Sequence, residues 1–313
     1  MTRLSRVVVF IAALAPSLPH AQTTPGVPLV IDAVAVDRAG LPVMDLKRED
    51  LEVWIAGYRV PIDRLTAVTS SDQRASRSVV LILDDLTVPL SIAPRVKEIA
   101  RRFVERMAPG DEMSILTFEG QAAETTGDRQ RLLEAIDAYY VRTAGVVRVD
   151  VLGEQVLGTV GSIARQLTTA EDRRKTVVAI GSAPLFDTPI PPPTVGRELR
   201  KEWTDTMRAM AFANVAFYVV DPGGLDQFGN RLAGNAGFAR ESGGVAFVNT
   251  NDFGGIVDRT MREAGNYYLI EVADPPVQRK ADLRELDVRV RRSGVTLRAR
   301  RAIPGTAPAD PSR

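Results

Sequence analysis

The sequence predicts an α/β fold: a doubly wound, mostly parallel sheet with an accessory β-sandwich module formed by the N-terminal and C-terminal segments. Three observations lead to this prediction. Apolar strand patterns alternate with helical patterns from residue 78 to about residue 264, as in a parallel sheet with helices on both faces. Residues 28–67 and 265–303 show strand patterns only. Together these two segments offer roughly seven strands, about the number that a sandwich needs.

Residues 1–21 have the pattern of a signal peptide. The stretch MTRLSR carries two positive charges, VVVFIAALAPSL is apolar but too short to span a bilayer, and Ala21 ends the short segment that follows. We expect cleavage after Ala21 and export of the mature chain to the periplasm or out of the cell. No later run is long and apolar enough for a membrane helix, and without cysteine there is no site for a lipid anchor.

The first β segment, residues 28–67, begins with VPLVIDAVAVD and continues with DLEVWIAGYRVPIDRLTAV. Ala56-Gly57 separates two strand-like runs and predicts a hairpin turn. The polar stretch 69–78 has no apolar period and is expected to be a linker. We expect residues 28–67 to pair with residues 266–301, so that the α/β unit is inserted into one β domain.

In the α/β unit, residues 78–264, strand patterns alternate with helical patterns of apolar residues. The expected strands are the apolar runs VVLILD, EMSILTF, KTVVAIGS, NVAFYVVD and VAFVN. The expected helices are APRVKEIARRFVERM, a segment capped by Asp128, residues 150–167, residues 196–211, NRLAGNAGFARE and DFGGIVDRTMREAG. Strand and helix alternate throughout, which favours parallel pairing.

The last segment returns to β structure. NYYLIEVAD, ELDVRVRR and VTLRARR alternate between apolar and polar residues, and residues 304–313 are expected to form a disordered tail. The pairs Tyr139-Tyr140 and Tyr267-Tyr268 are each expected to bury one ring and leave the other amphipathic. Trp203 is expected in the core or at the interface between the two parts.

The composition excludes several kinds of chemistry. The chain has 313 residues, a formal net charge of +1, no cysteine and a single histidine, His20, which lies in the expected signal peptide. The mature chain therefore lacks Ser-His-Asp and Cys-His catalysis, histidine-bound zinc and thiol redox chemistry. A charge near zero predicts no nucleic-acid partner.

Several stretches in order resemble a known family. They are VVLILDD, VERMAPGDEMSILTF, DRQRLLEAI, RKTVVAIGS, ANVAFYVVDPGGL, ESGGVAFVNTNDF and the strands after residue 265. This order is similar to the bacterial VWFA-related domain of acidobacterial type, and AVAVDRAGLPVMDLKREDLEVW is similar to the β segment that precedes it. The resemblance covers nearly the whole mature chain. It implies a von Willebrand factor type A fold of the Rossmann type, usually a ligand-binding or adhesion module.

The resemblance also implies where a metal would bind. Type A domains that hold Mg²⁺ or Mn²⁺ use an Asp-x-Ser-x-Ser turn after the first strand, a later Thr and an Asp after the fourth strand. Asp84 matches the first aspartate, but Leu86 and Val88 replace the hydroxyls. Counting from Asp85 recovers Thr87 alone.

At the two remaining ligand positions the sequence also departs from the pattern. Asp150 is the one oxygen donor near the Thr position, and Ser182 stands where the last aspartate is expected. An altered site would use Asp84, Asp85 and Thr87 with Asp150 or Ser182, and would bind Mg²⁺ or Mn²⁺ weakly.

The other interpretation is that Asp84 and Asp85 cap the turn and the helix that follow. We favour this one, because two lost hydroxyls leave too few protein oxygens for tight Mg²⁺ binding. We therefore expect a degenerate metal site and no cofactor.

These inferences predict an exported, non-enzymatic binding module. It would recognise a protein or a cell-envelope partner through loops at the carboxyl edge of the sheet, including Asp84, Asp85, Thr87 and Ser182. One alternative is a metal-independent scaffold or assembly subunit that docks through its β module. Another is a hydrolase that uses carboxylates and a divalent ion.

Overall fold

The computed structural model describes residues 29–70, 77–119, 124–142, 149–168, 174–181, 196–225, 233–272 and 283–304. The expected signal peptide, Ser182 and the tail from residue 305 onward lie outside these ranges. Within them, no helix is long and apolar enough to cross a membrane.

Five strands form one parallel sheet in the order β6-β5-β7-β8-β9. Their bounds are β5 Ser78–Leu83, β6 Glu112–Thr117, β7 Lys175–Ile180, β8 Val215–Val220 and β9 Ala246–Phe247. The chain starts in β5, moves to β6 on one side and then crosses to β7 on the other. The direction of winding thus reverses at β5, and ligands of open α/β sheets bind beyond the carboxyl ends of the strands at such a point.

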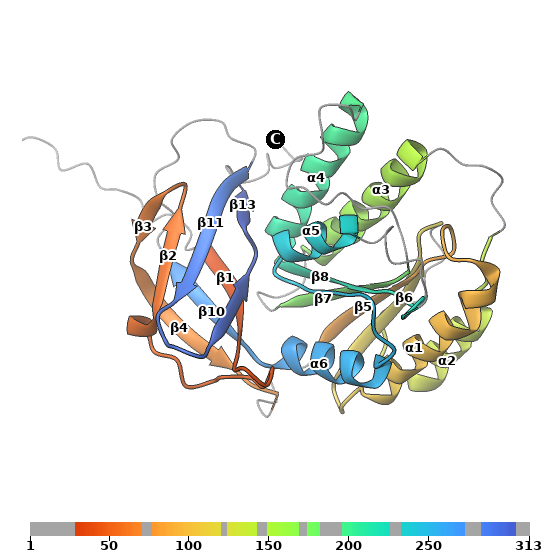
Figure 1. The fold of residues 1–313 in the computed structure, drawn as a ribbon, viewed down its shortest axis with the longest axis horizontal. Helices are drawn as coiled ribbons and strands as arrows, with labels where there is room; N and C mark the ends of the chain where they lie inside the picture. Colours follow the sequence, from red (N-terminus) through yellow and green to blue (C-terminus); the bar gives the residue numbers. More distant parts are fainter. Residues whose placement is uncertain are drawn as a thin grey trace, which may run out of the picture.

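Helices cover both faces of this sheet (Figure 1). On one face, residues of α1 Ala93–Glu105, α2 Arg129–Ala138 and α6 Phe253–Gly265 share a core with the strands. Residues of α3 Val149–Leu167, α4 Arg197–Ala213 and α5 Ala233–Glu241 form the core on the other face. This arrangement confirms the predicted doubly wound α/β class.

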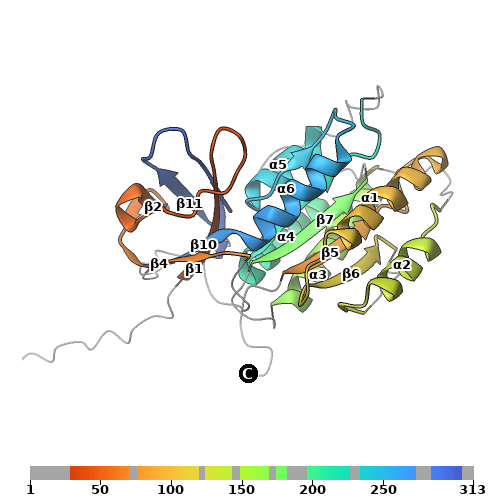
Figure 2. The same ribbon diagram turned by 90° about the horizontal axis from the view of Figure 1, so that it is seen from below.

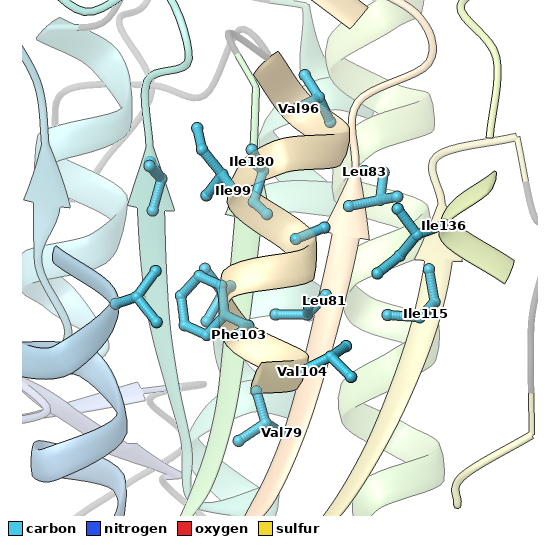
Figure 3. Packing of buried hydrophobic residues seen from close by; sticks show 14 of the residues in the cluster. Val79, Leu81, Leu83, Val96, Ile99, Phe103, Val104, Ile115, Ile136 and Ile180 are labelled. Carbon is cyan, nitrogen blue, oxygen red and sulfur yellow. The ribbon is translucent and has the colours of Figure 1, made fainter. Parts of the chain in front are cut away.

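The packing of α1 shows why the sequence period predicts this face. Val96, Ile99 and Phe103 recur at helical spacing and are fully buried. Figure 3 shows them over Leu81 and Leu83 of β5. Because β5 is covered by helices on both faces, its side chains after Ser78 are apolar without alternation. The expected cap is also observed: the Asp128 carboxylate accepts hydrogen bonds from two backbone N–H groups at the start of α2.

Two four-stranded antiparallel sheets form the β module, which comprises β1–β4 and β10–β13. One sheet has the order β12-β1-β10-β4, with β1 Leu29–Val36, β4 Ile62–Val68, β10 Tyr267–Val272 and β12 Thr296–Ala299. The other has the order β13-β11-β2-β3, with β2 Leu51–Ile55, β3 Tyr58–Val60, β11 Leu283–Val290 and β13 Ala302–Pro304. Strands from the two ends of the sequence alternate in the first sheet and meet at the β11-β2 pair in the second, and the apolar faces of both sheets share one core.

The turn between β2 and β3 follows the prediction. Ala56 and Gly57 both have positive φ, 50° and 82°, as the two central residues of a type I′ hairpin require.

The β module lies at the end of the parallel sheet where the strands begin. Arg174 precedes β7 and pairs with Asp32 of β1, and Asn214 precedes β8 and accepts a hydrogen bond from Arg300 after β12. In Figures 1 and 2 the antiparallel strands lie to the left of the parallel sheet, and α1 and α2 extend away from them. The carboxyl edge of the parallel sheet therefore faces away from the module.

Candidate functional site

The carboxyl edge of the parallel sheet carries the predicted residues that the structure describes. Asp84 and Asp85 follow β5, and the registers pair Leu83 with both Thr117 and Ile180, so the ends of β5, β6 and β7 are level. The next register pairs Ile180 with Val220 at the end of β8. The loops that follow four neighbouring strands thus leave the sheet at one edge.

Asp84 is fully buried, and its carboxylate accepts hydrogen bonds from the turn that follows. The Oδ1 atom accepts from the backbone N–H of Leu86 at 3.0 Å and of Thr87 at 2.8 Å. The Thr87 hydroxyl donates to Oδ2. The Tyr139 hydroxyl donates to the Asp84 carbonyl at 2.7 Å, and burial raises the pKa of this phenol. The structure thus brings Asp84 and Thr87 together in a capped turn.

Gly181 follows β7 and leaves no room beside Asp84. A Cβ atom added at Gly181 would lie 2.1 Å from the Asp84 Cβ. Real Cβ atoms do not approach so closely, so only glycine fits while the Asp84 side chain keeps this position. The carboxylate therefore reaches across the end of β7.

Asp85 is also buried, but it faces the end of β6. Its Oδ1 atom accepts from the backbone N–H of Phe118 at 3.0 Å, and Thr117 adds a side-chain hydrogen bond. Burial raises the pKa of Asp85, and these hydrogen bonds lower it by less. The backbone N–H of Arg142 donates to the Asp85 carbonyl at 2.9 Å. Asp85 thus ties the β5 loop to β6 and to the segment after α2.

Arg142 places a positive charge at the rim of this edge. Its Nε lies 3.6 Å from Asp85 Oδ2, and its Nη1 lies 3.7 Å from Glu119 Oε2. The guanidinium also lies over the Tyr140 ring, 5.6 Å from the centroid. Glu119 accepts a further hydrogen bond from Gln155 of α3. Arg142 thus lies between the carboxylates of Asp85 and Glu119.

Asp221, at the end of β8, is a residue that the sequence reasoning missed. It is 2% exposed, and its Oδ1 accepts from the Gly223 N–H at 2.8 Å. The Oδ2 atom is buried and has no hydrogen-bond partner among the described residues. Burial raises the pKa of Asp221, and the charge of Arg95 lowers it by less. The sequence did contain a signal: Asp221 ends an apolar run in NVAFYVVD just as Asp84 ends VVLILD.

Several strongly exposed apolar side chains belong to segments at the same edge. Six large apolar residues are strongly exposed in the described part of the chain, and four of them lie on segments that open onto this edge. These four are Leu90 before α1, Tyr140 after α2, Val151 in the first turn of α3 and Leu225 after β8. The other two, Leu41 and Tyr58, belong to the β module. Single exposed apolar residues are common, but several around one loop cluster indicate a contact surface.

The metal-ligand set remains a prediction. Asp150 belongs to the first turn of α3, but its side chain is outside what the structure describes, and so is the whole of Ser182. Among the residues that the structure does describe, no group of three or more His, Cys, Asp or Glu side chains could hold a metal ion. The carboxylate of Asp84 accepts hydrogen bonds from the backbone N–H groups of Leu86 and Thr87 and from the Thr87 hydroxyl, as a capping residue does.

Comparison with known proteins gives distant structural similarity alone. No family model and no curated protein matches the chain. The manganese-loaded TRAP protein of Plasmodium vivax aligns with a TM-score of 0.42 at 10% identity, over 75% of this chain and 96% of that one.

Two further solved structures align over smaller parts of their own chains. For human COPII-coat protein Sec24c the TM-score is 0.34 at 10% identity, over 73% of this chain and 44% of that one. For three N-terminal domains of the type V pili tip protein Mfa5 from Porphyromonas gingivalis the TM-score is 0.27 at 16% identity, over 51% and 27%. Similarity at this level assigns neither ligand nor activity.

Proposed function

We propose that the protein is an exported, non-enzymatic binding module that recognises a protein or cell-envelope partner through the loops at the carboxyl edge of its parallel sheet. The observation that carries this proposal is the group of exposed apolar side chains at that edge, formed by Leu90, Tyr140, Val151 and Leu225. Apolar side chains exposed together lose water contacts when a partner covers them, and this favours binding.

The recognition that we propose needs no metal ion. Asp84 and Asp85 direct their carboxylates into the turn and toward β6, where backbone and hydroxyl donors satisfy them. A partner that approached this edge would therefore meet apolar side chains and the Arg142 guanidinium rather than a free carboxylate pair. The buried carboxylates hold the loops in place, and the side chains around them make the contact.

A pull-down with matched variants tests the location of the surface. The mature chain, residues 22–313, is immobilised and exposed to the exported fraction of the organism that encodes it. We expect the double substitution Leu90→Ser and Leu225→Ser to reduce captured partner at least about tenfold, since two buried leucine contacts are worth roughly 3 kcal/mol. Leu41→Ser with Tyr58→Ser, an equal change on the β module, should leave capture intact.

The opposite result would favour the scaffold alternative. Tyr58 is 65% exposed at the hairpin between β2 and β3, which makes docking through the β module a specific second candidate. If the pair Leu41→Ser and Tyr58→Ser abolishes capture while the pair Leu90→Ser and Leu225→Ser retains it, the sheet-edge proposal is wrong.

A further inference from the structure

A narrow polar crevice lies between the parallel-sheet unit and the β module. Its volume is about 170 Å³, and it runs between the end of α5 and the strands β11 and β12. Four arginines line it, and Asp287 is the one carboxylate among its lining residues. The arginines are Arg240, Arg298, Arg300 and Arg301. Asp287 already forms an ion pair with Arg289 at 2.7 Å, so it leaves the positive charge of the crevice largely unopposed.

Behind the crevice, four arginines outnumber the two carboxylates with which they form ion pairs. Arg174 and Arg300 share a single acid, Asp32, and all three side chains are at most 5% exposed. Burial, together with repulsion from Arg174, lowers the pKa of Arg300 to about 10. Such a shift means that the charge of Arg300 is incompletely compensated.

The second buried acid is Glu263, and it does not restore the balance. It pairs with Arg298 at 2.5 Å and with Arg259 at 2.9 Å. Two carboxylates, Asp32 and Glu263, therefore face four guanidinium groups, and three of these are largely buried. Buried charge without a counterion is costly, so the junction is a favourable place for an anion.

Buried hydrogen-bond donors behind the crevice also lack acceptors. The Nε atom of Arg300 is buried and has no hydrogen-bond partner in the described part of the chain. The same holds for Nε and Nη1 of Arg298. A guanidinium is a rigid fork of donors that matches the oxygens of phosphate and sulfate.

Two backbone segments that line the crevice are in close contact beside it. Gly243 has a φ of 82°, and a Cβ atom there would lie 2.8 Å from the backbone of Ala299 and of Arg300. The end of α5 and the end of β12 thus meet directly beside the arginines. A preformed site loses less entropy when it binds a ligand.

We propose that this crevice is a binding site for a small oxyanion of the phosphate or sulfate class, held by arginines from both parts of the chain. Arg240 belongs to α5, whereas Arg298, Arg300 and Arg301 belong to the β12–β13 strands and the corner between them. The anion would supply the missing negative charge and link the two parts. This site lies at the amino edge of the parallel sheet and does not rest on the proposed partner surface.

A larger groove gives the anion a way in. It has a volume of about 780 Å³, runs along α4 and β11, and shares Leu286, Asp287 and Arg301 with the crevice. Glu241 borders the groove, where burial raises its pKa and the charges of Arg301 and Arg240 lower it by less, so this acid offsets part of the positive charge at the entrance.

Thermal unfolding with and without oxyanions tests the proposal. Inorganic phosphate and sulfate are titrated at constant pH and at constant ionic strength set with sodium chloride, so that general screening is held fixed. We expect a saturable rise of the melting temperature of roughly 2–4 °C, because a ligand that binds only the folded state stabilises it. The double variant Arg240→Gln and Arg301→Gln should lose this rise; both side chains are exposed, so the fold should persist.

Two exposed arginines elsewhere supply the control. Arg101→Gln with Arg131→Gln removes the same charge from α1 and α2, and this variant should keep the full rise. If the first double variant does not fold, Arg301→Gln alone makes the same comparison. The proposal is overturned if phosphate and sulfate stabilise the wild type no more than sodium chloride does, or if the crevice variants respond as the control does.

Discussion

The substitution Asp84→Ala separates a capping carboxylate from a metal ligand. It removes the acceptor of the Leu86 and Thr87 N–H groups and of the Thr87 hydroxyl. Each N–H left unpaired costs about 1–3 kcal/mol, while the hydroxyl can rotate toward another acceptor. We therefore expect the free energy of unfolding to fall by about 2–4 kcal/mol, a large fraction of the 5–15 kcal/mol that domains typically have.

Urea unfolding followed by circular dichroism measures this change. It is run in EDTA and again in excess Mg²⁺ or Mn²⁺, with Asp258→Ala as the control, whose exposed pair with Arg106 is worth about 1 kcal/mol or less. A cap predicts the same loss for Asp84→Ala in all three solutions. A metal ligand predicts a wild-type midpoint that rises with the ion and a loss that disappears in EDTA. That second pattern would refute the capping argument.

Three further predictions follow from buried contacts. Gly181→Ala should cost about 1–3 kcal/mol in urea unfolding, because its Cβ would overlap Asp84, whereas Gly254→Ala, whose Cβ would lie 3.7 Å from its nearest neighbour, should be nearly neutral. Burial raises the pKa of Asp221, so the folded state holds its proton more tightly than the unfolded one, and stability falls as pH rises from about 4 through the folded pKa. Asp221→Asn should therefore raise the melting temperature at pH 7 but not at pH 4, and equal effects at both values would contradict this sign. Asp32→Ala should lower the free energy of unfolding by about 3–5 kcal/mol, because it leaves the buried Arg174 without its carboxylate partner. A loss below about 1 kcal/mol would show that the pair contributes little.

The sequence predicted the elements well because their periods reflect burial. β5 is apolar from Val79 to Leu83 since helices cover both of its faces, and α1 shows the helical spacing of its buried side. The expectation that each tyrosine pair buries one ring holds for one pair and fails for the other. Tyr139 is buried and Tyr140 is exposed, as expected, but Tyr267 and Tyr268 are both buried.

The second pair differs because β10 is covered on both sides. The Tyr268 hydroxyl accepts from the Leu46 N–H within the β module, whereas the Tyr267 hydroxyl accepts from the Arg174 N–H at the α/β unit. When both faces of a strand are covered, neither face is exposed to solvent. The alternation of apolar and polar residues in β10 does not show that its second face is covered.

The sequence did not predict the ion pairs between the β module and the α/β unit. Asp32 and Arg174 are 142 positions apart, and neither stands in a pattern that marks burial. The position of Asp84 was predicted, since an aspartate at the end of an apolar strand lies at the sheet edge. Its hydrogen bonds depend on the path of residues 85–87 and on the absence of a side chain at Gly181, which only the structure shows.

The order of the elements explains why the carboxyl edge is free. The α/β unit begins with a strand, β5, and ends with a helix, α6, that runs back against the strands, so it enters and leaves at the amino edge. The Ser70 N–H donates to the Asn266 side chain at 3.4 Å, which places the two connections side by side. Strands on either side of the unit, β4 and β10, pair directly. Because β4 and β10 pair at the two connections, the β module sits at the amino edge, and the strands β5, β6, β7 and β8 end at the opposite edge.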